Sequence, residues 1–310
     1  MNTATREAYG NTLVELIDKN KDVVVLDADL AHATKTLKFS QKCPERFFNM
    51  GIAEADMIGT AAGLATCGKI PFASTFAVFA TGRAFDQVRN TVCYPNLNVK
   101  IVGSHAGITV GPDGGSHEAI EDIAIMRSLP DMSVIVPSDD VEARAAVLAA
   151  AEIKGPMYLR MARVASPTYH KEDYVFEFGK GELVKDGKDV TIIATGIMVP
   201  KALEAARALA EDGIEAQVVN IHTIKPLDEK MVVECAKKTG RVITVEEATI
   251  YGGLGSAVCE VLSDKYPVPV RRIGVQDKFG KSGDPDKLLE EYGLTSKKIM
   301  ETAQKMLRGE

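Results

Sequence analysis

Short apolar runs alternate with helical patterns along almost the whole chain. In the first half these runs are continuously apolar and rich in Val, Ile and Leu, which is typical of parallel strands that are buried on both faces. Strands are predicted at residues 22–28, 69–75, 99–103, 132–137 and 156–162.

Helices are predicted between these strands, for example over residues 54–68 and 139–153. Ser138 or Asp139 is suited to begin the second helix, because its side-chain oxygen can accept a hydrogen bond from a backbone N–H of the first turn. Strands and helices that alternate in this way form a parallel sheet with helices on both faces. The predicted fold class is therefore α/β.

The pattern breaks after residue 163, in the stretch VASPTYHKEDYVFEFGKGELVKDGK. Pro, Gly and charged residues dominate there, which is typical of a linker. A second series of strand and helix patterns follows. We therefore expect two domains, each with a mostly parallel sheet and helices on both faces, over residues 1–165 and 189–310, joined by a linker at 166–188.

The length and net charge of the chain bear on its domain number and on the partners it can have. A chain of 310 residues exceeds the usual size of one hydrophobic core. The formal net charge of -6 gives no electrostatic reason to expect nucleic acid or an anionic membrane as the main partner. The N-terminus lacks a signal-peptide pattern, and no apolar run reaches the roughly 18 residues that span a bilayer. The protein is predicted to be cytoplasmic.

Five widely spaced cysteines, without a C-x-x-C pair, argue against a disulfide framework or a zinc site. We expect reduced thiols that are mostly packed inside the fold.

A glycine-rich segment, GSHAGITVGPDGGSH at residues 103–117, lies between a predicted strand and a predicted helix. The carboxyl ends of strands are where open α/β sheets bind ligands, and this segment carries His105, Asp113 and His117. A solvated loop is the ordinary interpretation of one loop histidine, but three such groups together favour a site. Their spacing fits no short zinc pattern, so we expect acid–base or hydrogen-bonding roles and no metal.

Other nucleotide and hydrolase motifs receive little support. The turn YGGLGSA at residues 251–257 lacks the full dinucleotide fingerprint, so helix packing explains it better. The sequence contains neither the phosphate-binding G-x-x-x-x-G-K-[ST] nor the serine-hydrolase G-x-S-x-G.

Two further segments combine apolar residues with side chains that could bind a ligand. STFAVFATGRAFDQVRN, residues 74–90, supplies Phe76, Phe79 and Phe85, which at helical spacing are usually core residues. Phe76 and Phe79 follow a predicted strand, however, and could wall a pocket for a flat ring. FFNMGIAEAD, residues 47–56, places Glu54 after an apolar run at the start of a helix.

Together with VIVPSDDVEA, these segments resemble the pyrimidine-binding domain of transketolases, which are thiamine diphosphate enzymes that transfer two-carbon ketol units. The resemblance covers nearly the whole chain and continues into a transketolase C-terminal-like domain. It implies the thiamine diphosphate-binding fold. It also implies that Glu54 hydrogen-bonds N1′ of the cofactor's aminopyrimidine ring, where a carboxyl group among apolar residues can share a proton with a ring nitrogen.

The resemblance assigns further residues position by position. It implies that Phe76 and Phe79 are pocket walls and that Asp29 is a cofactor-side residue. It implies that catalytic and substrate-channel roles fall to His105, Asp113 and His117, with Arg160 holding the sugar phosphate and Arg163 as its substitute. The family often has a third aromatic residue where this chain has Gly82.

The family holds Mg²⁺ and diphosphate with a Gly-Asp-Gly sequence that this chain lacks. The resemblance therefore implies an N-terminal partner subunit that carries the Mg²⁺ ligands, self-association of this chain, and a heterotetramer that acts on sugar phosphates. Three alternatives stay open: a deoxyxylulose-phosphate synthase-like enzyme, the beta subunit of a 2-oxo acid dehydrogenase first component, and a non-catalytic binding subunit.

Overall fold

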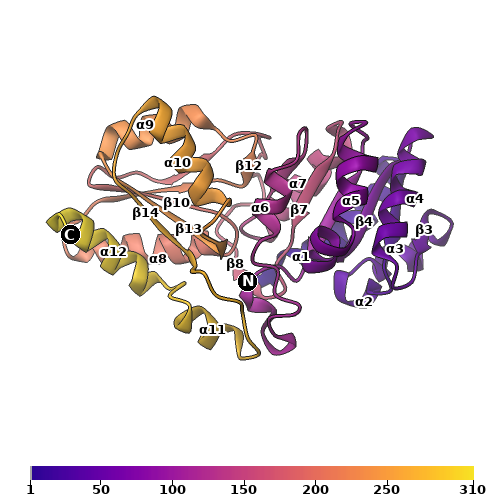
Figure 1. The fold of residues 1–310 in the computed structure, drawn as a ribbon, viewed down its shortest axis with the longest axis horizontal. Coiled ribbons are helices and arrows are strands. Elements are labelled where there is room, and N and C mark those ends of the chain that lie inside the picture. Colours follow the sequence, from indigo (N-terminus) through magenta and orange to yellow (C-terminus); the bar gives the residue numbers. More distant parts are fainter. Residues whose placement is uncertain (1) are drawn as a thin grey trace.

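The protein folds into two α/β halves that lie side by side (Figure 1). The structure is a computed structural model that describes residues 2–310. In Figure 1 the first half of the chain, coloured indigo to magenta, lies on the right and the second half, orange to yellow, on the left. Each half is built around its own mostly parallel sheet with helices on both faces, as the sequence predicted.

The first sheet has seven strands in the spatial order β12-β6-β7-β5-β4-β2-β3, and only the β12–β6 pair is antiparallel. The strands predicted in the first half are all present, and β2 and β5 are buried along their whole length. The strands of this sheet are β2 (Val23–Asp27), β3 (Phe47–Asn49), β4 (Ile70–Phe76), β5 (Lys100–Ser104), β6 (Ser133–Ile135), β7 (Met157–Arg160) and β12 (Thr223–Lys225).

Alternate residues of β2 face different layers of helices, because successive side chains of a strand point to opposite faces. Val23 and Val25 belong to a buried cluster with α1, α3 and α7, whereas Val24 and Leu26 belong to one with α4 and α6. Helix α7 begins as predicted, with Asp139 accepting a hydrogen bond from the backbone N–H of Glu142.

The helical segments of this half are α1 (Thr5–Lys19), α2 (Ala31–Thr34), α3 (Leu37–Lys42), η1 (Pro44–Arg46), α4 (Glu54–Thr66), η2 (Phe79–Arg83), α5 (Phe85–Gln87), η3 (Val88–Cys93), η4 (Ile108–Asp113), α6 (Asp122–Arg127) and α7 (Asp140–Glu152).

The second sheet has five strands in the order β14-β13-β10-β11-β9, and only β9 is antiparallel to its neighbour. Its strands are β9 (Glu182–Lys185), β10 (Val190–Ala194), β11 (Ala216–Asn220), β13 (Val242–Thr249) and β14 (Val270–Val275). The helices of this half are α8 (Met198–Glu211), α9 (Glu229–Thr239), α10 (Leu254–Lys265), α11 (Pro285–Glu291) and α12 (Ser296–Arg308).

Strands of the predicted linker and of the second half tie the two halves together. The stretch predicted as a linker, 166–188, contains β9, which forms the edge of the second sheet, and most of β8 (Ala165–Pro167), which pairs with β1 (Asn2–Ala4). Strand β12 comes from the second half of the chain but pairs with β6 in the first sheet. One buried apolar cluster likewise contains residues of both halves, such as Met57 and Val258.

None of the helices within residues 2–310 is long and apolar enough to cross a bilayer.

Candidate active site

The carboxyl ends of β4 and β5 bring two of the predicted site residues together. Phe76 is the last residue of β4, and its partner in the parallel pairing is Ser104, the last residue of β5. His105 follows directly, and its ring stacks on that of Phe76 with the centroids 4.0 Å apart. The fold therefore places these rings at the sheet edge where α/β proteins bind ligands.

Two more predicted rings complete what we call the aromatic cluster: Phe76, Phe79, His105 and His117. Phe79 begins the π-helix η2 just after β4, and its ring lies nearly parallel to that of Phe76, with centroids 5.8 Å apart. The ring of His117 meets these two edge-on, at 6.3 Å from Phe76 and 5.5 Å from Phe79. Phe85, by contrast, packs against the buried apolar cluster that both halves share.

His105 is buried and held as a neutral ring. The guanidinium of Arg6 lies 3.0 Å from Nε2, and because a guanidinium only donates, Nε2 must be the acceptor. The proton therefore lies on Nδ1, which donates to Ser104 Oγ at 2.9 Å. Burial, together with the positive charges of Arg6 and Arg163, lowers the pKa of His105 to about 3. At neutral pH this histidine is a hydrogen-bonding group without charge.

Glu54 is the first residue of α4, and only 4% of its side chain is exposed. Its carboxylate accepts a hydrogen bond from Arg83 Nη1 at 3.1 Å. The same guanidinium lies over the ring of Phe79, 4.1 Å from the centroid. Glu54 therefore lies beside the aromatic cluster, and Arg83 connects the two.

Arg83 was missed as a site residue at the sequence level, although it follows Gly82 directly. Apart from its chain neighbours and its own helical turn, no atom of residues 2–310 lies within 4 Å of the position that a Cβ on Gly82 would take. The place where the family often has a third aromatic residue is therefore open in this chain.

The glycine-rich segment folds over the cluster as η4 and a tight turn that rests on the second half. Gly111 and Gly114 have φ values of 75° and 78°, which L-residues with a side chain rarely adopt. A Cβ on Gly115 would lie 2.5 Å from the carbonyl oxygen of Gly280. The glycines thus permit both the turn and its close approach to the loop around residue 280.

Asp113, at the end of η4, is exposed and pairs with Arg163 at 3.2 Å. Arg163 also donates to the carbonyl oxygen of Val110, and its charge acts on His105. A partly exposed cation therefore stands beside the aromatic cluster.

Arg160 occupies a different environment from the one expected. Its guanidinium is 6% exposed and pairs with the fully buried Asp122 at 2.7 Å. It also donates to the carbonyl oxygens of Ala119 and Glu247, at 3.2 and 2.9 Å. These contacts join α6 and β7 to β13 of the second half. Because Nε and Nη2 donate inside the fold, Arg160 is less suited to hold a sugar phosphate than expected, and that role stays a prediction.

Asp29 lies on the same edge of the first sheet but outside these contacts. It follows β2 with a φ of 63°, is exposed, and accepts a hydrogen bond from Asn49 Nδ2 at 3.1 Å. Since Asp27 and Asn49 are partners in the β2–β3 pairing, this contact continues the sheet edge.

Two buried carboxyl groups lie near each other where the halves meet. Glu118 is 3% exposed, and Glu247 accepts a hydrogen bond from the backbone N–H of Thr109 at 2.7 Å. Burial and the proximity of Glu247 raise the pKa of Glu118 to about 7. Gly280 allows this packing, because a Cβ there would lie 1.5 Å from Glu118 Oε2.

Among residues 2–310, Glu142, His170 and Glu182 form the one group whose potential metal-ligating atoms all lie within 4.8 Å of one another. Both ring nitrogens of His170 are already hydrogen-bonded, to Asp139 at 2.9 Å and to Glu182 at 2.8 Å. Glu142 accepts from Ser138, Tyr174 and Asn220. These internal partners make the group a structural anchor for the segment around His170.

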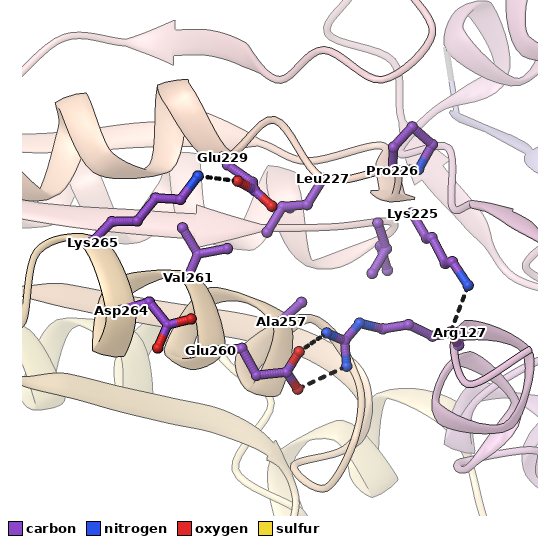
Figure 2. Close-up of a pocket in the computed structure, with 11 residues that line it drawn as sticks. Arg127, Lys225, Pro226, Leu227, Glu229, Ala257, Glu260, Val261, Asp264 and Lys265 are labelled. Atoms are coloured by element: carbon purple, nitrogen blue, oxygen red, sulfur yellow. Dashed lines mark hydrogen bonds and ion pairs between the residues drawn. The ribbon is translucent and has the colours of Figure 1, made fainter. Parts of the chain in front are cut away.

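A cavity of 600 Å³ lies between α6, α10 and β12, away from the aromatic cluster (Figure 2). Most of its charged side chains pair with one another or with backbone: Arg127 with Glu260, Lys265 with Glu229, and Lys225 with carbonyl oxygens of α6 and the residues after it. It contains none of the residues predicted for the site.

Comparison with known proteins gives matches over both halves of the chain. Residues 1–168 match the transketolase pyrimidine-binding domain, and residues 179–299 match the transketolase C-terminal domain. The chain is 52% identical over 307 residues to a putative transketolase C-terminal section of Methanocaldococcus jannaschii, covering 97% of this chain and 96% of that protein.

A second relative is the 6-deoxy-6-sulfo-D-fructose transketolase subunit SqwH of Clostridium sp. (strain MSTE9). It is 48% identical over 301 residues, which cover 97% of this chain and 94% of that protein. A solved structure of a split-gene transketolase, described as an inactive beta4 tetramer, superposes with a TM-score of 0.91 at 55% identity over 99% of both chains.

Proposed function

The chain belongs to the transketolase family, and from this premise we propose that it is the C-terminal subunit of a two-subunit transketolase. Its proposed reaction transfers a two-carbon ketol unit from a ketose phosphate to an aldose phosphate. The observation that carries this proposal is the meeting of Glu54, the aromatic cluster and the glycine-rich segment at one sheet edge.

The residues present fit the aminopyrimidine part of thiamine diphosphate. A flat heteroaromatic ring needs an aromatic surface and a hydrogen-bonding group at its edge. Phe79 offers a partly exposed ring face that already binds one planar group, and Glu54 offers a buried carboxyl group next to it. The position beside Gly82 is free of other side chains. Asp29 is proposed to contact the cofactor from its position on the same edge.

When bound, thiamine diphosphate supplies the electron sink that lets the carbon–carbon bond beside a ketone break and form again. Glu54 is proposed to hold or share a proton at the edge of the aminopyrimidine ring. The diphosphate and Mg²⁺ are proposed to bind mainly to the N-terminal partner subunit, because this chain contains no Gly-Asp-Gly sequence.

The substrate is proposed to bind over the two histidines of the aromatic cluster. Neutral His105 is fixed by Arg6 and Ser104, so its ring is oriented before substrate arrives. His117 is less buried and can donate to a sugar oxygen on which negative charge develops. For the terminal phosphate we propose Arg163, with Asp113 as its neighbour, in place of Arg160.

The assembly is proposed to contain the N-terminal subunit and more than one copy of this chain, as a heterotetramer. Support comes from relatives of nearly the same length that are described as a C-terminal section and a subunit. The tetrameric structural neighbour supports self-association. A cytoplasmic location also remains a proposal; the five cysteines, all free within the described chain, fit a reducing compartment.

Reconstitution tests this function. The purified chain should give no ketol transfer with thiamine diphosphate, Mg²⁺, a ketose phosphate and an aldose phosphate, and turnover should appear when the N-terminal subunit is added. Donors with a terminal sulfonate belong in the assay, because one relative is named for a sulfosugar. Robust turnover by this chain alone, or condensation of pyruvate with triose phosphate in place of ketol transfer, would contradict the proposal.

A further inference from the structure

Arg83 has an exposed side chain that is nevertheless held in place by two contacts. Its side chain is 55% exposed, yet its guanidinium is held 3.1 Å from the buried carboxylate of Glu54 and 4.1 Å from the centroid of the Phe79 ring. A side chain this exposed is usually free to move in water, so a fixed position between a carboxylate and an aromatic ring calls for an explanation.

These two partners are the groups that the proposed function assigns to the cofactor's ring. A guanidinium is planar, carries N–H donors in its plane and stacks on aromatic faces. An aminopyrimidine ring shares its flatness, stacks in the same way and also meets a carboxyl group at its edge. The remaining ring neighbours of Phe79 are Phe76 at 5.8 Å and His117 at 5.5 Å. Arg83 therefore covers the accessible approach to this ring.

We propose that Arg83 is a positioning residue that occupies the aminopyrimidine site before the cofactor binds and competes with it for Glu54 and Phe79. This inference rests on the proposed function. In the subunit without cofactor, the guanidinium keeps Glu54 paired and the face of Phe79 covered. Cofactor binding then has to displace it, and the open space beside Gly82 gives the displaced side chain a place to go.

The competition predicts a gain in affinity on removal of the guanidinium. A half-exposed ion pair and a cation–π contact on an exposed arginine should together reduce cofactor affinity by about 3- to 30-fold. In the complex with the N-terminal subunit, Arg83→Ala should therefore bind thiamine diphosphate about 3- to 30-fold more tightly than wild type, measured by calorimetric titration. Arg83→Lys, which keeps the charge but not the planar stacking group, should lie between the two.

Arg89→Ala is the matched control. Arg89 lies in the same segment, is exposed, and its one hydrogen bond within residues 2–310 is to Asn90. Its removal should leave cofactor affinity unchanged. Equal affinity of Arg83→Ala and wild type, or weaker binding by the variant, would overturn the proposal, since weaker binding would make Arg83 part of the occupied pocket.

A second measurement needs neither the partner subunit nor activity. The isolated chain, with its Phe rings labelled for NMR, is titrated with 4-amino-2-methylpyrimidine. The Phe79 ring signals should shift in Arg83→Ala at concentrations that leave wild type unchanged. If the wild-type complex fails to bind thiamine diphosphate, the proposed function fails, and this titration still decides the role of Arg83: identical shifts in both proteins would refute it.

Discussion

At the scale of single residues, the surroundings of Glu54 distinguish it from an ordinary surface glutamate. It is 4% exposed at the start of α4, with an aromatic ring nearby and a guanidinium as its partner. Helix N-termini favour acidic groups, so the position is stable without any ligand. The same geometry leaves the carboxyl group at the edge of the space in which we propose that the cofactor ring binds.

Glu54→Gln in the assembled enzyme should reduce ketol transfer by about 10²- to 10⁴-fold, the usual value of a positioned acid–base group. The folded assembly should survive, because Gln keeps the size of the side chain and the lost ion pair is half-exposed, worth about 1 kcal/mol or less. Steady-state turnover and exchange of the C2 proton of bound cofactor, followed by NMR, measure the effect. Exchange at the wild-type rate would show that Glu54 is structural.

The two arginines after β7 should respond differently to truncation. Arg163→Ala should raise KM for phosphorylated donors by about 10- to 150-fold, as expected for a charge-assisted contact, and leave cofactor affinity unchanged. An equal loss with unphosphorylated donors would count against a phosphate contact.

Arg160→Ala should instead lower the free energy of unfolding by about 3 to 5 kcal/mol, because it leaves the buried carboxylate of Asp122 without its cationic partner and with only the hydroxyl of Tyr158 as a donor. Urea unfolding of both variants at neutral pH compares the two residues. A stable Arg160→Ala protein with a raised KM would restore the original assignment.

At the scale of elements, parallel strands explain why residues far apart in sequence meet. Strands β4 and β5 run in the same direction, so the residues that follow them, Phe79 and His105, emerge at one edge. The segment after β8 is organised differently, by side chains. His170 lies between Asp139 of the first half and Glu182 of β9, and its ring touches those of Tyr169 and Tyr174.

This anchor predicts a loss of stability at alkaline pH. Burial by itself lowers the pKa of His170, but the hydrogen bonds to Asp139 and Glu182 outweigh it and raise that pKa to about 10. The stabilisation is therefore complete below the unfolded pKa of about 6.5 and is lost as pH rises from there to about 10. Through His170, the free energy of unfolding should fall by at most about 1.4 kcal/mol per pH unit.

His170→Gln should remove that slope. Urea unfolding of wild type and variant at several pH values between 7 and 10 tests this, with His32→Gln, on the partly exposed α2, as control. Curves that stay parallel for wild type and His170→Gln would show that the ring does not carry its proton in the folded state.

At the scale of the whole molecule, the two halves behave as one structure. They share a buried apolar cluster, β12 of the second half completes the first sheet, and Arg160 reaches from β7 to the carbonyl of Glu247. The candidate site lies beside this contact, and the glycine-rich segment rests on the loop around Gly280. Residues of the second half therefore pack against the segments that form the candidate site.

Buried Glu118, with the charge of Glu247 nearby, makes the free energy of unfolding depend on pH in the acid range. Because the pKa of Glu118 is raised to about 7, the folded state binds more protons than the unfolded state between about pH 4.5 and 7. The contribution of Glu118 to the free energy of unfolding therefore falls as pH rises through this window. Glu118→Gln, which stays neutral, should flatten the decline by up to about 1.4 kcal/mol per pH unit.

Urea unfolding at pH 5, 6 and 7 measures this difference, with the exposed Glu211→Gln as control. A variant whose stability changes with pH in the same way as wild type would show that Glu118 is already ionised throughout the window.

The sequence by itself determined the α/β class, the positions of the main strands and helices, and the residues of the aromatic cluster. It could do so because burial repeats along the chain with the period of each element, because Phe76, Phe79 and His105 stand next to strand ends, and because His117 ends the glycine-rich segment after β5. Only the tertiary structure decided that Arg83 pairs with Glu54, that Arg160 is sealed against Asp122, and that β12 crosses into the first sheet. Such pairings join residues 29, 38 and roughly 90 positions apart, and no local pattern records which distant group a charged side chain will meet once both are buried.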